Sequence, residues 1–111
     1  MHKPFSDVVT NKIINELSEN LVSVSSYPNP FNNSTTISYT SIVSDFIIVS
    51  VYNIKGEKVK ILSNGKCNVG ENITYWDGTD SSGSLASSGL YFVVIRNKDK
   101  IFDSHKITLM H

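Results

Sequence analysis

The sequence has no pair of cysteines, no excess of either charge and no long apolar run. Its 111 residues contain one cysteine, Cys67, so no disulfide can form within the chain. Ten acidic residues balance ten basic ones, which leaves no strong field to attract a nucleic acid or an anionic membrane. No apolar stretch is long enough to cross a bilayer. We therefore expect neither nucleic-acid binding nor membrane insertion.

The motifs of common active sites are also missing. There is no glycine-rich phosphate loop ending in Lys-Ser/Thr, no Gly-x-Ser-x-Gly elbow and no cysteine pair for zinc. Cys67 has no flanking pattern typical of a nucleophile and is interpreted as a small, half-buried side chain. His2 and His111 lie at or near the ends, and His105 is expected on the surface of the last strand. We predict that the chain is not an enzyme and uses no cofactor or metal.

Residues 77–83, Asp-Gly-Thr-Asp-Ser-Ser-Gly, form the densest cluster of carboxyl and hydroxyl groups. Oxygen ligands this close together suit a hard cation such as Ca²⁺. The spacing does not match the Asp-x-Asp-x-Asp-Gly loop, however, and no glutamate closes the site. We favour a turn in which Asp77 and Asp80 bond to their own backbone.

Apolar residues alternate with polar ones along most of the chain after residue 20, which predicts strands rather than helices. Strands are expected at residues 21–26, 34–42, 46–52, 58–62, 72–76, 90–96 and 101–110. Turn signals separate them, among them the dipeptide Asn64-Gly65. Seven short strands without a helix among them predict an all-β, immunoglobulin-like β-sandwich of antiparallel strands.

The first 20 residues are polar and weakly patterned. Ile13, Ile14 and Leu17 recur at helical spacing, but so short a run is marginal without a docking surface. We interpret residues 1–20 as a linker or tail that could hold a short helix, and residues 21–111 as the folded domain. The N-terminus lacks the apolar core of a signal peptide, so we expect this domain to be part of a longer protein.

The strand phases also predict the core. The single tryptophan, Trp76, and Tyr91 fall on inward positions of adjacent strands and should be in contact. Residues 46–52 are apolar on both faces and should form a central strand, with Ile47, Val49 and Val51 inward. The lysine-rich segment 58–62 suits a sheet edge, where charge discourages pairing with other sheets. Tyr27 and Phe31 bracket two prolines and are expected to fold back as lids over the core.

Taken in order, these motifs resemble the type A C-terminal sorting domain of the type IX secretion system (Por secretion system) of Bacteroidetes. The family opens with a Tyr-Pro-Asn-Pro-Phe-Asn motif, and this chain has Tyr27, Pro28, Asn29, Pro30, Phe31 and Asn32. It departs at Asn33, where proline is usual. The opening motif is the most specific part of a resemblance that covers about residues 21–111.

The rest of the family pattern follows in the same order. Residues 51–62 are similar to its apolar-Tyr-Asn/Asp-x-x-Gly-x-x-Val run, and residues 70–78 to its Trp-Asp-Gly run. Residues 86–92 resemble the small-Ser-Gly-x-Tyr-Phe segment, and residues 106–111 the Lys-hydrophobic-x-hydrophobic terminus. The matching positions are Tyr52, Gly56, Val59, Trp76, Asp77, Gly78, Gly89 and Tyr91 in the core pattern, and Lys106, Ile107 and Leu109 at the end.

The resemblance implies a non-catalytic sorting signal, attached to an upstream cargo domain and recognised by the translocon of the type IX system. The cargo would pass from the periplasm to the outer-membrane surface or the medium, and a sortase would usually remove the domain. We expect a monomer whose final strand offers a main-chain edge and an apolar Ile107/Leu109 face to a receptor. The alternative is a structural or ligand-binding immunoglobulin-like module, such as an adhesin, a carbohydrate-binding domain or a hook-cap-like spacer.

Overall fold

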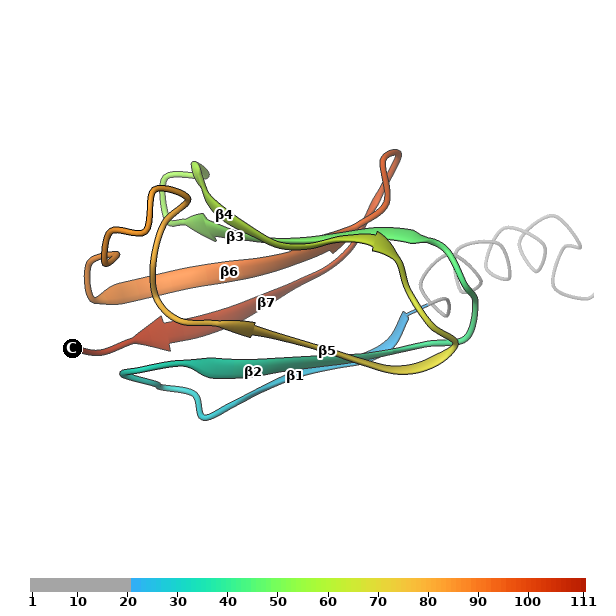
Figure 1. Ribbon diagram of the computed structural model, residues 1–111, viewed down its shortest axis with the longest axis horizontal. Coiled ribbons are helices and arrows are strands. Elements are labelled where there is room, and N and C mark those ends of the chain that lie inside the picture. Colours follow the sequence, from blue (N-terminus) through green and yellow to red (C-terminus); the bar gives the residue numbers. More distant parts are fainter. Residues whose placement is uncertain (1–20) are drawn as a thin grey trace, which may run out of the picture.

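The computed structural model describes residues 21–111, and the expected linker at residues 1–20 lies outside the described part. Seven strands make up two sheets packed face to face (Figure 1). They are β1 (Leu21–Tyr27), β2 (Thr35–Ser41), β3 (Phe46–Asn53), β4 (Lys58–Lys66), β5 (Gly70–Trp76), β6 (Gly89–Arg96) and β7 (Ile101–Leu109). In this described part, no helix is long and apolar enough to span a membrane.

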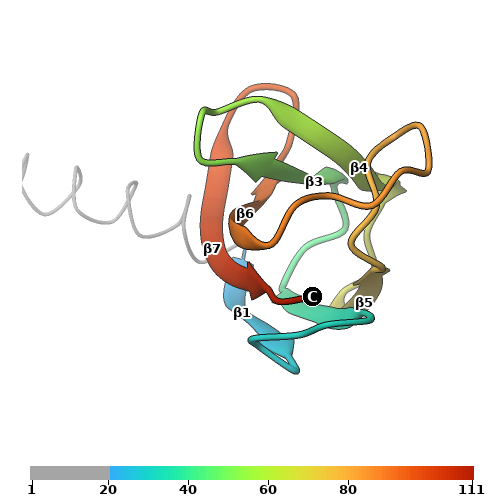
Figure 2. The same cartoon turned by 90° about the vertical axis from the view of Figure 1, so that its left-hand side faces the viewer.

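The strand order confirms the all-β sandwich. One sheet has the order β1-β2-β5 and the other the order β4-β3-β6-β7. Every hydrogen-bonded pair of strands is antiparallel. Consecutive strands change sheet between β2 and β3, between β4 and β5, and between β5 and β6, which is the immunoglobulin-like arrangement. Viewed end-on in Figure 2, β1 lies beside β7 on one side of the sandwich and β4 lies near β5 on the other.

The inward residues of the central strands β2 and β3 place the core between the sheets. In β2, Thr35, Ile37, Tyr39 and Ser41 are buried, while the residues between them are partly exposed. In β3, the expected inward residues Ile47, Val49 and Val51 are at most 4% exposed. β3 is central and β4 is an edge strand, as predicted. Period-two burial is what a sheet with one covered face requires.

Two expectations about the strands were wrong. Asn64 and Gly65 do not form a turn but lie inside β4, where they pair with Ile48 and Ile47 of β3. Cross-strand pairing along the whole length of β3 outweighs the local turn preference of an Asn-Gly dipeptide. The strands of Trp76 and Tyr91 are not neighbours either, because β5 and β6 belong to opposite sheets.

Candidate functional site

An aromatic cluster fills one end of the sandwich. Trp76 is fully buried, and its ring centroid lies 5.0 Å from that of Tyr91 and 5.5 Å from that of Phe31. The indole Nε1 donates to the carbonyl of Thr79 at 2.8 Å, and the Tyr91 hydroxyl donates to the carbonyl of Ser87 at 2.6 Å. The predicted contact between Trp76 and Tyr91 is confirmed, and it joins the two sheets.

Phe31 forms the expected lid, whereas the expectation for Tyr27 was wrong. Phe31 is 3% exposed and Tyr27 is 81% exposed. The difference follows from strand phase. Tyr27 pairs with Thr36, and these two positions lie out of phase with the inward-facing Ile37. Since side chains alternate along a strand, Tyr27 lies on the outer face of the three-stranded sheet.

The side chain of Asn29 pairs with the edge of β7. Its Nδ2 donates to the carbonyl of Lys106 and its Oδ1 accepts from the main-chain N–H of Thr108, each at 3.0 Å. A carboxamide carries the same donor and acceptor as a peptide group. Asn29 therefore bonds to β7 as one residue of a neighbouring strand would.

The backbone of Phe31 continues this pairing. Its N–H donates to the carbonyl of Thr108 at 3.0 Å, and its carbonyl accepts from the N–H of Met110 at 2.8 Å. Phe31 and Leu109 form an isolated parallel bridge. The expectation of an open main-chain edge at the end of β7 was wrong, because Asn29 and Phe31 already form hydrogen bonds with that edge.

The apolar side chains at the end of β7 belong to the core. Ile107 and Leu109 are fully buried, so the expectation that they present an apolar face to a receptor was wrong. The two methyl groups of Leu109 lie 3.4 and 3.5 Å from the point where a Cβ on Gly78 would be. Gly78 also has a φ of 78°, which favours glycine. Lys106 is exposed.

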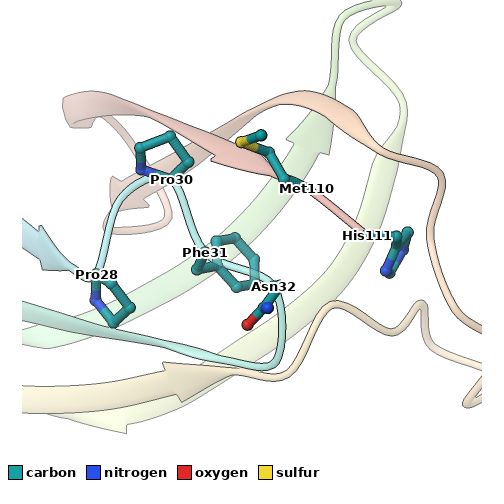
Figure 3. Close-up of a pocket in the computed structure, with 6 residues that line it drawn as sticks. All are labelled: Pro28, Pro30, Phe31, Asn32, Met110 and His111. Atoms are coloured by element: carbon teal, nitrogen blue, oxygen red, sulfur yellow. The ribbon is translucent and has the colours of Figure 1, made fainter.

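What remains accessible here is an open groove of about 460 Å³ between the opening motif and the last residues. In Figure 3, the segment carrying Pro28 and Pro30 lies beside the strand end that carries Met110. The groove is lined by Pro28, Pro30, Phe31, Asn32, Met110 and His111. The N–H of His111 donates to the Ser88 hydroxyl at 3.0 Å and its Nε2 donates to the Ala86 carbonyl at 2.7 Å. These two bonds fix the last residue at the end of the groove.

The loop after Trp76 has the predicted self-bonded turns. Asp77 Oδ1 accepts from the N–H and hydroxyl of Thr79, and Asp80 Oδ1 accepts from the N–H and hydroxyl of Ser82. The Thr79 side chain is the main reason that the pKa of Asp77 is lowered, and the Ser82 side chain has the same effect on the pKa of Asp80. Lys60 Nζ lies 3.5 Å from Asp77 Oδ1. These bonds hold the loop that accepts the Trp76 indole.

The other positions of the family pattern shape turns and strand ends. Gly56 is in the β3–β4 turn with a φ of 80°, and the Asn53 Oδ1 accepts the N–H groups of Lys55 and Glu57 in that turn. Val59 packs against the core from its edge. Tyr52 is half-buried and Gly89, also half-buried, begins β6.

Cys67 and His105 are less exposed than the sequence suggested. Cys67 is 5% exposed rather than half-buried. His105 is half-buried, and its Nε2 lies 2.8 Å from the hydroxyl of Ser26 in β1. This contact joins the edges of the two sheets.

Residues 25–109 match the model of the secretion system C-terminal sorting domain family. No curated protein matches the chain. Among solved structures, dimeric latent PorU from Porphyromonas gingivalis is similar with a TM-score of 0.65 and 21% identity, covering 78% of this chain and 9% of that one. PorZ, an essential bacterial surface component of the type-IX secretion system of the same organism, gives a TM-score of 0.53 and 19% identity, covering 80% of this chain and 12% of PorZ.

A third similar structure is the alkylpurine DNA glycosylase AlkC of Pseudomonas fluorescens, with a TM-score of 0.53 and 13% identity over 83% of this chain and 30% of that one. At these identities the structural likeness shows a shared fold alone. The chain spans only a small part of PorU and PorZ.

Fold and site together define an immunoglobulin-like module whose opening motif is bonded to its last strand. The chain belongs to the secretion system C-terminal sorting domain family, whose members are sorting signals of type IX secretion. The family implies export across the outer membrane and linkage to upstream cargo, and its members are generally non-catalytic.

Proposed function

We propose that this domain directs an upstream cargo through the type IX translocon by presenting the groove between its opening motif and its last residues. The observation that carries the proposal is the pairing of Asn29 and Phe31 with β7. This pairing brings the opening motif and the end of β7, which are far apart in the sequence, together in one surface. A receptor that contacts this surface would bind only the folded domain, since an unfolded chain does not bring the two segments together.

The chemistry of the groove suits a protein partner. Its lining is mostly apolar, with Pro28, Pro30 and Met110 accessible at the rim. Exposed proline side chains are rigid, so little conformational entropy is lost when a partner binds them. A methionine side chain is flexible and can adapt to the shape of a partner. The main-chain carbonyl of Lys106 bonds Asn29, and the exposed Lys106 side chain is included in the proposed site as a source of positive charge. The proposed receptor site therefore combines the sorting-motif residues Pro28 to Asn32 with Lys106, Met110 and His111.

The domain acts in this proposal as a signal and carries out no reaction itself. The cargo reaches the periplasm, crosses the outer membrane, and is released or held at the surface after a sortase removes the domain. The folded unit is residues 21–111 and works as a monomer. Removing residues 1–20 should leave the melting temperature nearly unchanged.

A fusion experiment tests the function. A signal peptide and a folded reporter are placed before residues 1–111, and in a second fusion before residues 21–111, in a bacterium with a type IX system. Both fusions should bring the reporter to the surface or the medium, and the same reporter without the domain should stay in the periplasm. Fusions that stay in the periplasm while the domain is folded would contradict the proposed function.

A further inference from the structure

The outer face of the three-stranded sheet carries two exposed tyrosines in register. Tyr27 of β1 pairs with Thr36 of β2, and Thr36 pairs with Tyr75 of β5. Directly opposed residues point to the same face. Tyr27 is 81% exposed and Tyr75 is 65% exposed, so both rings flank the Thr36 hydroxyl on one open surface. This sheet is the lower layer in Figure 1.

The two rows next to the tyrosines are rich in hydroxyl groups. Their members, in register across the sheet, are Ser25, Ser38 and Ile73, followed by Ser23, Thr40 and Glu71. The single charged group in these three rows is the Glu71 carboxylate, which accepts a hydrogen bond from the Ser38 hydroxyl at 2.9 Å. The face therefore combines two aromatic rings with five hydroxyl side chains and carries no cation in these rows.

The outer face of the other sheet has a different character. There an apolar groove of about 370 Å³ is lined by side chains that include Tyr52, Phe92, Val94 and Ile101, with Arg96. The hydroxyl-rich face is thus a property of one sheet and does not follow from the fold. Solubility does not require two exposed tyrosines on that face either, because Ser or Thr would suffice.

We propose that the Tyr27–Thr36–Tyr75 face is a binding site for a neutral polysaccharide. Exposed tyrosine rings can stack on the apolar C–H face of a sugar ring while their hydroxyls stay hydrated. Ser and Thr hydroxyls donate and accept hydrogen bonds, which matches the hydroxyl groups of a sugar. With strands about 4.8 Å apart, β1 and β5 lie roughly 10 Å from each other, a span covered by a short oligosaccharide.

The other classes of partner fit this surface less well. A nucleic acid requires cations for its phosphates, and the three rows have none. A protein interface core is normally enriched in aromatic residues, Tyr included, and depleted of Ser. The two tyrosines would fit such a core, but Ser and Thr make up most of this face and would not. An anionic polysaccharide would meet the Glu71 carboxylate without a compensating positive charge. A neutral, hydroxyl-rich chain is the ligand class that remains.

The test uses the whole chain and defined oligosaccharides as probes. Cellohexaose, mannohexaose and an oligogalacturonate of equal length are titrated into ¹⁵N-labelled protein. A neutral probe should shift amide signals of β1, β2 and β5 and leave those of β6 unchanged. The anionic oligogalacturonate should bind at least about threefold more weakly. Equal binding of the anionic probe, binding of none of the three probes, or shifts confined to the other sheet would overturn the proposal.

Variants on the face separate stacking from folding. Tyr75→Ala should weaken binding of the neutral probe at least about threefold, and Tyr75→Phe should retain most of the affinity because the ring remains. Tyr75 lies outside the opening motif, so its variants do not touch the proposed receptor groove.

Phe46→Ala is the matched control, because Phe46 is a half-exposed aromatic of the other sheet. Unfolding curves followed by Trp76 fluorescence establish that each variant is folded. Equal affinity in folded Tyr75→Ala and Phe46→Ala proteins would overturn the site.

Discussion

Asn29 is bonded to Thr108 across 79 positions of sequence, and its carboxamide occupies the place of a strand residue beside β7. Together with Phe31 it pairs the outward main-chain groups of Lys106, Thr108 and Met110. Unpaired strand edges invite association with other chains. The opening motif thus protects the last strand as well as shaping the surface next to it.

Replacing Asn29 should uncover this edge. Asn29→Ala removes the hydrogen bonds to the Lys106 carbonyl and the Thr108 N–H. Because both bonds are exposed and water can replace the lost partner, we expect a cost of about 0.5–1.5 kcal/mol in the free energy of unfolding. Asn29→Asp should also destabilise, because a carboxylate can accept from Thr108 but cannot donate to Lys106. Urea denaturation gives the free energy, and hydrogen exchange at the Thr108 amide should become faster. Asn33→Ala, an exposed asparagine close by, is the control. Unchanged exchange at Thr108 would show that the side chain does not hold the strand.

Of the substitutions considered, the one in the aromatic cluster should lower the free energy of unfolding the most. Trp76 is fully buried and contacts Phe31 and Tyr91, so Trp76→Ala should cost about 3–5 kcal/mol. That is a large share of the stability of a small domain. Tyr75→Ala, at the exposed neighbouring position, should cost far less. Chemical denaturation compares the two variants, and equal midpoints for Trp76→Ala and the unmodified protein would refute the assignment of Trp76 to the core.

Tyr39 makes stability depend on pH in the alkaline range. Burial, with a smaller effect from the charge of Cys67, raises the pKa of Tyr39 to about 12 in the folded protein. A tyrosine in an unfolded chain has a pKa of about 10. The folded state therefore keeps its proton while the unfolded state loses it, and stability falls as pH rises from about 10 towards 12.

Tyr39→Phe removes this contribution, so its free energy of unfolding should decline less steeply above pH 10. Urea denaturation at a series of pH values from 8 to 11 measures the slope. The pKa of Tyr91 is also raised by burial, so part of the decline should remain in the variant. Parallel slopes for the variant and the parent chain would contradict a raised pKa at Tyr39.

Much of the fold follows from local sequence because its strands alternate regularly. Ile37 and Val93, for example, are each buried between two partly exposed neighbours. Asn64-Gly65 was misjudged for a different reason. Its conformation depends on pairing with β3, and a local turn preference contains no information about a partner some 17 residues away.

The site was harder to predict than the fold. The motif identified Asn29 and Phe31 as important, but their bonds to β7 depend on how two distant segments are placed side by side. The exposure of Tyr27 depends on the pairing of β1 with β2, because a shift by one residue would move its ring to the other face. The burial of Ile107 likewise comes from its register opposite Tyr91. Register between distant strands is what the pattern of a single segment does not reveal.

Two variants that would disrupt the proposed receptor site cannot separate recognition from folding. Deleting Lys106 to His111 would remove Ile107 and Leu109, which are fully buried, and Phe31→Ala would open the aromatic cluster. In both cases a reporter held in the periplasm could reflect an unfolded domain. Substitutions at the exposed rim of the groove avoid this difficulty.

We expect the double variant Met110→Ser, His111→Ser to remain folded and to lose export. Met110 is 54% exposed and His111 is exposed, so the free energy of unfolding should change by about 1 kcal/mol or less. The reporter fusion should then stay in the periplasm, because the groove has lost the Met110 side chain from its apolar rim and the His111 imidazole from its end. The matched control is Leu85→Ser, Leu90→Ser, which removes two exposed apolar side chains that do not line the groove. It should be exported normally. If the Met110/His111 variant is folded and exported as well as this control, the receptor does not read the groove, and the fusion of the unmodified domain still decides whether the domain is a sorting signal.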